Sequence, residues 1–204
     1  MDKIKLVAIL RGIRPAEAAE HIETLIKAGF RYIEIPLNSP DWQQSIPQMA
    51  ARFGEQAVIG AGTVLKVEQV DFLADAGAKL IVTPNTQPAT IRRAVARGMR
   101  VCAGCATATE AFSALDAGAQ WLKIFPSSTF GPDYIRALKA VLPPEVPVLA
   151  VGGVTPENLA SWVEAGCAGA GLGSDLYRAG QAVERTRQQA ERFIACLLYT
   201  SDAA

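Results

Sequence analysis

The sequence predicts a single (β/α)8 barrel, and three observations carry that prediction. Eight short runs rich in Val, Ile and Leu recur along the chain, and a helical pattern follows each run. Strand–helix alternation requires a parallel sheet with right-handed crossovers, whose strands are covered on both faces. The length of 204 residues suits eight such units in one domain. Together these features favour a closed barrel over an open doubly wound sheet.

The predicted strands are short apolar runs bounded by polar residues or glycine. They lie at Leu6–Leu10, Tyr32–Leu37, Val58–Gly62, Leu80–Thr83, Val101–Gly104, Trp121–Phe125, Val148–Val151 and Ala168–Leu172. Between the strands, apolar residues recur at the helical period of about 3.6 residues. The clearest predicted helices are Glu17–Ala28, Val67–Ala76, Ala89–Arg97 and Pro132–Leu142.

Helix-start and helix-stop signals support this segmentation. Thr107 to Glu110 have the sequence of a capping box, and Thr155 before Pro156 matches an N-cap with proline at the first helical position. Glycine suits the left-handed residue that closes a helix. Four helical stretches end in this way, at Ala28-Gly29, Ala76-Gly77, Ala117-Gly118 and Ala165-Gly166. No linker or second domain is evident, so the barrel is predicted over residues 1–195.

Composition excludes several classes of function. Lys plus Arg and Asp plus Glu number 20 each, so no basic field exists to hold nucleic acid or an anionic membrane surface. No apolar run approaches the about 18 residues of a transmembrane helix. The run Leu6–Leu10 is too short for a signal-peptide core, which predicts a cytoplasmic protein. The one histidine, His21, is expected at the surface or in an interface, and a histidine-rich metal site is excluded.

Cys102 and Cys105 form a C-x-x-C pair, which is typical of a redox motif or of half a zinc site. A zinc site needs further ligands, and the chain has neither a second such pair nor a second histidine. The pair also lies along a strand and not at a helix N-terminus, which would activate a thiolate. We therefore interpret both residues as small buried side chains.

The last nine residues, from Cys196 to Ala204, resemble the translation of a transposon-end sequencing adapter. Residues 196–204 are therefore predicted to be a non-native tail and are left out of fold reasoning. The alternative is a genuine tail that extends the last helix. Cys196 is assigned no role in either case.

Lys123 interrupts the apolar strand Trp121–Phe125. Lysine is rarely buried without compensation, and desolvation lowers its pKa because it disfavours the ammonium form. A neutral amine is a nucleophile that forms a Schiff base with a carbonyl substrate. The alternative is a lysine at the end of a strand whose amine reaches water.

Glu34 raises the same question within the second predicted strand. A carboxyl group facing the barrel mouth would serve as a general base, whereas the alternative is a structural ion pair or an exposed strand end. Two opposite charges inside the strands of one barrel each need a partner. The pair Lys123 and Glu34 is therefore the predicted reaction centre.

Glycines at the ends of the seventh and eighth strands predict a phosphate site, the common location in such barrels. They are Gly152-Gly153 and Gly173, which is followed by Ser174 and a predicted short helix at Asp175–Tyr177. The N-terminus of such a helix would face the anion. Arg11, after the first strand, suits a carboxylate or phosphate through its forked donors, and is otherwise a surface arginine.

The motifs as a set resemble the KDPG/KHG aldolase family over residues 4 to 195. They are Glu34-Ile35-Pro36-Leu37-Asn38-Ser39-Pro40, Ile59-Gly60-Ala61-Gly62-Thr63-Val64, Val82-Thr83-Pro84-Asn85, Leu122-Lys123-Ile124-Phe125-Pro126 and Val151-Gly152-Gly153-Val154. The resemblance implies a class I aldolase that uses no metal or other cofactor and assembles as a homotrimer.

The resemblance also implies a role for each matching residue. Lys123 would be the Schiff-base lysine, and Glu34 would donate and accept protons. Arg11 and Thr63 would bind the keto-acid end of the substrate. The phosphate would be held by Gly152, Gly153, Gly173 and Ser174.

One position discriminates between substrates within the family. Members that act on the gluconate epimer carry an arginine four residues after the glutamate, where this chain has Asn38. The expected substrate is therefore 2-dehydro-3-deoxy-6-phospho-D-galactonate, cleaved to pyruvate and D-glyceraldehyde 3-phosphate. The alternatives are the gluconate epimer, 4-hydroxy-2-oxoglutarate, a metal-free phosphosugar isomerase and a non-catalytic sensor of phosphorylated metabolites.

Overall fold

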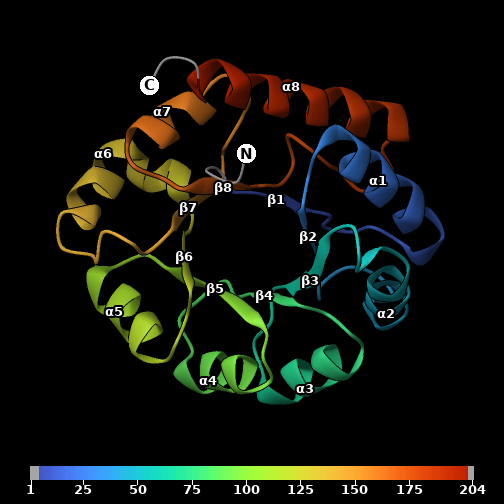
Figure 1. The fold of residues 1–204 in the computed structure, drawn as a ribbon, viewed down its shortest axis with the longest axis horizontal. Coiled ribbons are helices and arrows are strands. Elements are labelled where there is room, and N and C mark those ends of the chain that lie inside the picture. Colours follow the sequence, from blue (N-terminus) through green and yellow to red (C-terminus); the bar gives the residue numbers. More distant parts are fainter. Residues whose placement is uncertain (1–4, 202–204) are drawn as a thin grey trace.

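Eight parallel strands close into one barrel in chain order, and β8 pairs with β1 to complete the ring (Figure 1). The computed structural model describes residues 5–201, and their side chains as far as residue 197. Helices follow the strands and surround the barrel, as the sequence predicts for a (β/α)8 fold.

The eight predicted strands are confirmed, and none of their ends is displaced by more than one residue. The strands are β1 Lys5–Ile9, β2 Tyr32–Pro36, β3 Val58–Gly62, β4 Leu80–Val82, β5 Arg100–Cys105, β6 Trp121–Ile124, β7 Val148–Val151 and β8 Gly169–Leu172. The helices are α1 Pro15–Ala28, α2 Trp42–Phe53, α3 Val67–Asp75, α4 Pro88–Ala96, α5 Ala108–Asp116, α6 Ser127–Lys139, α7 Leu159–Glu164 and α8 Val183–Ser201.

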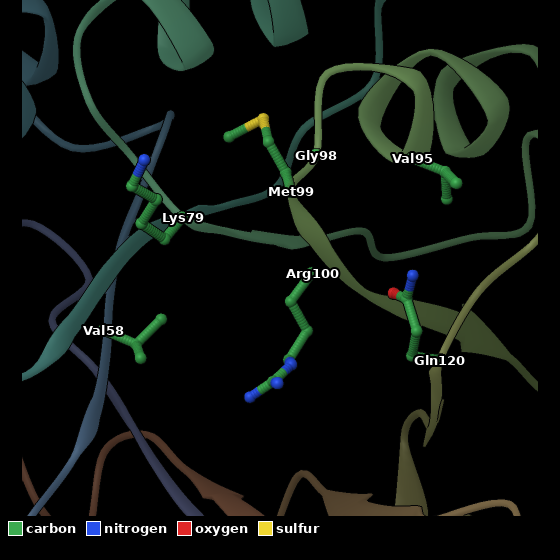
Figure 2. A pocket seen from close by; sticks show the side chains of 7 residues that line it. All are labelled: Val58, Lys79, Val95, Gly98, Met99, Arg100 and Gln120. Carbon is green, nitrogen blue, oxygen red and sulfur yellow. The ribbon is translucent and has the colours of Figure 1, made fainter.

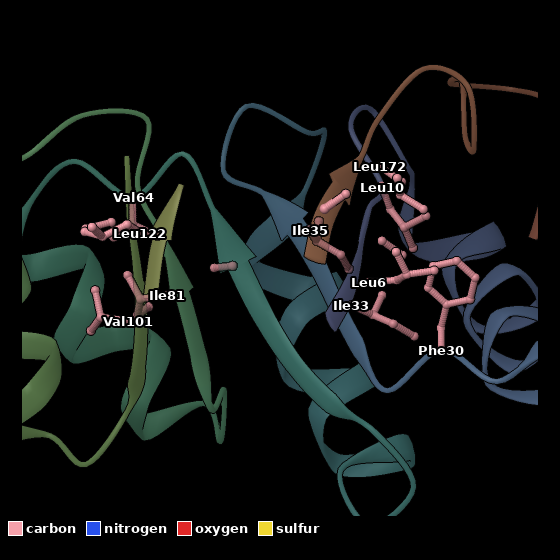
Figure 3. Close-up of a cluster of buried hydrophobic side chains, with 14 of the residues drawn as sticks. Leu6, Leu10, Phe30, Ile33, Ile35, Val64, Ile81, Val101, Leu122 and Leu172 are labelled. Carbon is pink, nitrogen blue, oxygen red and sulfur yellow. The ribbon is translucent and has the colours of Figure 1, made fainter. Parts of the chain in front are cut away.

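Side-chain alternation divides each strand into an outer and an inner face. Ile33 and Ile35 of β2 lie in the buried cluster between strands and helices, with Phe30 among their neighbours (Figure 3). Successive residues of a strand point to opposite faces. Glu34, between the two isoleucines, therefore points into the barrel. The same alternation in β6 places Leu122 outside and Lys123 inside.

Glycine allows β8 to close the ring beside β1. A Cβ on Gly169 would lie 2.0 Å from the Lys5 carbonyl oxygen, and a Cβ on Gly171 would lie 2.8 Å from a Val151 methyl carbon. Real Cβ atoms do not tolerate such distances, so side chains at these positions would force the strands apart. The glycines that the sequence places in the eighth strand thus serve barrel closure.

Aromatic and cationic side chains fill the N-terminal end of the barrel interior. The Tyr32 and Trp121 rings meet edge to face, with centroids 4.9 Å apart. The Arg100 guanidinium lies 4.9 Å from the Trp121 centroid and 5.8 Å from that of Tyr32. These contacts combine aromatic packing with cation–π attraction.

The capping box at the start of α5 and the four glycines at helix ends are confirmed. Thr107 and Glu110 form the capping box, in which the Glu110 amide donates to Thr107 Oγ1 at 3.3 Å and the Thr107 amide donates to Glu110 Oε2 at 2.9 Å. The four glycines after alanine all adopt positive φ, as the left-handed closing residue requires. They are Gly29, Gly77, Gly118 and Gly166.

Three local predictions are wrong at the level of helix boundaries. The helix predicted at Pro132–Leu142 begins earlier, at Ser127, and is interrupted at Gly131 by a non-helical φ of +77°. Thr155 does not cap α7; it begins a turn in which its carbonyl accepts from the amides of Asn158 and Leu159. The short helix predicted at Asp175–Tyr177 is a single turn, closed by the Leu176 and Tyr177 amides on the Gly173 carbonyl.

The prediction that His21 lies at the surface or in an interface is also wrong, because the side chain is buried within the chain itself. Its side chain is 1% exposed, with Nδ1 2.8 Å from Thr186 Oγ1 of α8 and the ring packed edge to face against Tyr177. Thr186 Oγ1 also accepts from Gln181 Nε2 at 2.7 Å. Polar neighbours of His21 in α1 suggested that its side chain is exposed, but α8 covers this face of α1. The helical period of α1 alone does not reveal which of its faces another helix covers.

No helix within residues 5–201 has the length and apolarity needed to cross a membrane. Helix α8 continues into the predicted non-native tail as far as Ser201, and residues 202–204 lie outside the described residues. The assignment of 196–204 as non-native stays a prediction, because helix formation does not depend on the origin of a sequence.

Burial of His21 makes a testable contribution to the pH dependence of stability. Burial lowers the pKa of His21 below 6.5, against an opposing effect of Glu17 and Glu20. The unfolded chain therefore binds a proton at this site before the folded one does, and stability falls as pH drops below about 6.5. The loss is at most about 1.4 kcal/mol per pH unit.

We expect a smaller loss of unfolding free energy between pH 7.5 and 5.0 in His21→Gln than in the unmodified protein, measured by urea denaturation. Equal losses in the two proteins would show that the folded and unfolded states bind protons equally at His21.

Candidate active site

The carboxyl ends of the strands gather predicted site residues at one mouth of the barrel. Because all eight strands are parallel, their C-terminal ends share one end of the ring. Arg11 follows β1, Glu34 lies within β2 and Thr63 follows β3, while Lys123 lies within β6. The structure thus brings together residues that are separated by more than 100 positions in the sequence.

Lys123 is buried on the inner face of β6, with 5% of its surface exposed. It pairs in register with Gly104 of β5 on one side and Leu149 of β7 on the other. Its Nζ lies 4.7 Å from the centroid of the Phe125 ring. Burial removes much of the solvation that stabilises an ammonium ion, while Glu34, Cys102 and Arg11 lie near enough to act on the charge of the amine.

Glu34 is buried on the inner face of β2, with 2% of its surface exposed. Its Oε2 has no hydrogen-bond partner among the described residues. Gly60 stands opposite in register, and a Cβ added to Gly62 would lie 2.2 Å from Oε2 and 2.3 Å from Oε1. Gly62 therefore leaves the space that the carboxyl group occupies, whereas Gly60 makes room for β4, since a Cβ there would lie 2.3 Å from the Leu80 carbonyl oxygen.

Burial and charge shift the two reactive groups in opposite directions. Burial raises the pKa of Glu34 from 4.5 to about 7, although Lys123 and Arg11 oppose the rise. Burial also lowers the pKa of Lys123, and the negative charge of Glu34 opposes that change. A carboxyl group with a pKa of about 7 can give or take a proton near neutral pH, and burial makes the amine easier to deprotonate than that of an exposed lysine. Such a pair is equipped for nucleophilic and general acid–base chemistry on a carbonyl compound.

Arg11 and Thr63 lie at the rim of the same mouth. Arg11 Nη1 donates a hydrogen bond to Asn38 Oδ1 at 2.7 Å. Thr63 adopts a left-handed φ of +57°, which is unusual for a β-branched residue. Arg11 lies two residues after the end of β1 and is exposed, and Thr63 directly follows β3 and is half-buried.

The predicted phosphate loops are adjacent, because β7 pairs with β8. Gly152 and Gly153 have φ values of +99° and +73°, and the Gly153 carbonyl accepts from Asn158 Nδ2 at 2.8 Å. At the end of β8, the Ser174 carbonyl accepts from Arg178 Nε at 2.9 Å. In both hydrogen bonds the loop contributes a carbonyl oxygen. The bonds therefore fix the loops and do not occupy the backbone N–H groups that an anion would need.

Two serines near these loops were missed at the level of the sequence. Ser127 is fully buried; its hydroxyl donates to the Ile124 carbonyl at 2.7 Å and accepts from the Val151 amide at 3.0 Å, which ties β6 to β7. Ser128 packs closely against Gly153, since a Cβ added to Gly153 would lie 2.6 Å from the Cβ of Ser128. The signal was available, since two hydroxyl residues directly follow the Phe125-Pro126 strand end.

Within residues 5–201, no group of three or more His, Cys, Asp or Glu side chains is placed to hold a metal ion. Cys102 and Cys105 are buried free thiols, and burial raises the pKa of each to about 12. They lie on opposite faces of β5, in the inner and outer clusters respectively. The interpretation of this pair as small buried side chains is confirmed.

A pocket of about 410 Å3 opens at the N-terminal end of the barrel, opposite the candidate site (Figure 2). Lys79 and Arg100 line it, but Figure 2 shows their side chains pointing away from each other. Two cations that do not converge form no obvious anion site.

Comparison with known proteins identifies the family. A family model described as "Aldolase: KDPG and KHG aldolase" matches residues 1–192. The chain belongs to this family. It is 69% identical over 192 residues to the 2-dehydro-3-deoxy-6-phosphogalactonate aldolase of Escherichia coli (strain K12), and the match covers 94% of each chain.

Solved structures agree with the barrel fold. One titled "Native KDPGal structure" is 65% identical with a TM-score of 0.97, covering 99% of this chain and 98% of that one. A cube-shaped protein cage designed by fusing symmetric oligomeric domains is 66% identical with a TM-score of 0.97, covering 98% of this chain and 74% of that one.

The contact between Gly62 and Glu34 can be tested without measuring catalysis. In Gly62→Ala the added methyl group must displace the Glu34 carboxyl group from its buried position. Because burial is the main cause of the raised pKa, we expect the pKa of Glu34 to fall from about 7 toward 4.5, measured by carbon NMR titration and assigned with Glu34→Gln. Gly173→Ala is the control for glycine replacement, because a Cβ there would meet no atom within 4 Å and the backbone φ is not positive. An unchanged Glu34 titration in a folded Gly62→Ala variant would contradict the described geometry.

Proposed function

We propose that this protein is a class I aldolase that cleaves 2-dehydro-3-deoxy-6-phospho-D-galactonate to pyruvate and D-glyceraldehyde 3-phosphate. The observation that carries the proposal is the buried pair of Lys123 and Glu34 at the catalytic end of the barrel. Membership of the aldolase family and 69% identity to an Escherichia coli enzyme named for this substrate support it.

Lys123 would supply the nucleophile. Its neutral amine attacks the C2 ketone of the 2-oxo acid and forms a carbinolamine, which loses water to give an iminium ion. The C3–C4 bond then breaks, and its electron pair moves into the iminium to form an enamine. Protonation of the enamine at C3 and hydrolysis of the resulting imine release pyruvate and regenerate the lysine. The electron sink of this sequence is the iminium itself, so these residues can carry the reaction without a cofactor.

Glu34 would move the protons that each step requires. It removes the proton of the C4 hydroxyl as C3–C4 breaks, which releases the aldehyde. It then has a proton to return when the enamine is converted to the imine. A carboxyl group with a pKa of about 7 is suited to both directions of transfer near neutral pH.

The remaining residues would orient the substrate. Arg11 and Thr63 are proposed to bind the keto-acid end, where a guanidinium can pair with a carboxylate. The glycine loops at the other side of the mouth are proposed to hold the phosphate, through Gly152, Gly153, Gly173 and Ser174. Binding of the remote phosphate would then help to orient the reacting carbon above Lys123.

The identity to a galactonate-type enzyme favours this substrate over the alternatives left open by the sequence. Asn38 supports the same choice, since gluconate-type members are expected to carry arginine there. We further propose a cytoplasmic homotrimer that serves galactonate catabolism. The designed cage built from symmetric oligomeric domains, to which this chain is 66% identical, supports a symmetric oligomer. Light scattering coupled to gel filtration would test the trimer.

Reductive trapping tests the proposed nucleophile. The protein is incubated with pyruvate and sodium borohydride, and intact mass and peptide mapping follow. We expect one reduced pyruvate adduct on Lys123, and loss of both adduct and turnover in Lys123→Ala. Absence of an adduct on folded, unmodified protein would reject the Schiff-base mechanism.

Replacement of Glu34 separates proton transfer from imine formation. We expect Glu34→Gln to slow aldol cleavage by about 10²–10⁴-fold, the usual contribution of a general acid–base group, while pyruvate can still be trapped. The carboxylate raises the pKa of Lys123, so its removal should shift the pH midpoint of trapping downward, because the neutral amine then exists at lower pH. An unchanged cleavage rate would remove Glu34 from the mechanism.

A further inference from the structure

We propose that Asn38 is a positioning residue, which holds the Arg11 guanidinium where it can bind the carboxylate of a 2-oxo acid. The inference rests on the proposed function, because it concerns the site of the substrate carboxylate. Its basis is the 2.7 Å hydrogen bond from Arg11 Nη1 to Asn38 Oδ1 across the barrel mouth.

Backbone hydrogen bonds fix the turn that contains Asn38. The Ser39 amide donates to the Pro36 carbonyl at 2.9 Å, which closes a tight turn with Asn38 in its third position. Just before Asn38, the Leu37 amide donates to the Gly62 carbonyl at 2.8 Å, so the turn is fixed to the end of β3. The acceptor oxygen therefore has a defined place four residues beyond Glu34.

A second hydrogen bond joins the two loops beside the first. The Gly12 amide donates to Ser39 Oγ at 2.9 Å, and the Ser39 side chain is buried. Consecutive residues on one loop, Arg11 and Gly12, thus bind consecutive residues on the other. The backbone beneath Arg11 is held by this bond, whereas the exposed guanidinium at the end of its long side chain depends on Asn38.

An exposed arginine side chain loses rotamer freedom when it is ordered. The bond to Asn38 orders it before a ligand arrives, which lowers the cost of binding. The amide oxygen is a neutral acceptor, so it leaves the charge of Arg11 intact and the other guanidinium donors available. A carboxylate at position 38 would hold the guanidinium equally well but would compete with the carboxylate of the substrate.

Two ketone probes distinguish a role of Asn38 in carboxylate binding from a general effect on imine formation. Pyruvate carries a carboxylate and acetone does not, yet both ketones can form an imine with a lysine. Borohydride trapping of each is measured against concentration in the unmodified protein, Asn38→Ala and Asn38→Asp. Gln43→Ala, an exposed residue of α2 outside the site, serves as the control.

We expect both Asn38 variants to need about five- to tenfold more pyruvate for half-maximal trapping, the net effect of one ordinary hydrogen bond. Trapping of acetone should change by less than about twofold in each. Unchanged pyruvate trapping in folded Asn38→Ala would overturn the inference, as would equal losses for the two ketones. If the unmodified protein traps no pyruvate at all, the proposed function itself fails, and the inference fails with it.

Discussion

The burial of two opposite charges inside one barrel is the constraint on which the rest of the structure depends. Lys123 and Glu34 stand on inward faces of β6 and β2, each flanked by outward-facing apolar residues. An isolated buried charge is costly, whereas a pair of titratable groups can share or exchange a proton. Burial raises the pKa of Glu34 to about 7 and lowers that of Lys123, so the packing that costs stability also makes the acid able to exchange a proton near neutral pH and the amine easier to deprotonate.

The glycines around the pair show how the barrel makes room for it. Gly62 lies against the carboxyl group of Glu34, and Gly104 stands beside Lys123 in register. A Cβ on Gly104 would lie within 2.5–2.7 Å of the backbone of Thr83 and Pro84. Small residues in the strands therefore have two effects. They bring the backbones of neighbouring strands together, and they leave interior volume for two long polar side chains.

The rim of the mouth is organised by short hydrogen bonds between successive loops. Arg11 meets Asn38 across the loops after β1 and β2, and Ser127 links the end of β6 to β7. At the opposite end, Arg100 and Trp121 fill the interior. One end of the barrel is thus devoted to closure and packing, while the other carries polar groups with directed donors and acceptors. This division follows from the parallel strands, which present all carboxyl ends on one side.

The sequence by itself determined the barrel, its strand ends to within one residue, and Lys123 and Glu34 as the unusual charges. It could do so because strand period, helix caps and charges within apolar runs are local signals. Only the tertiary structure decided the burial of His21, since α8 covers it from more than 160 residues away. It alone revealed the Arg11–Asn38 bond and the roles of Ser127 and Ser128, because hydrogen bonds between separate loops depend on how the strands are assembled.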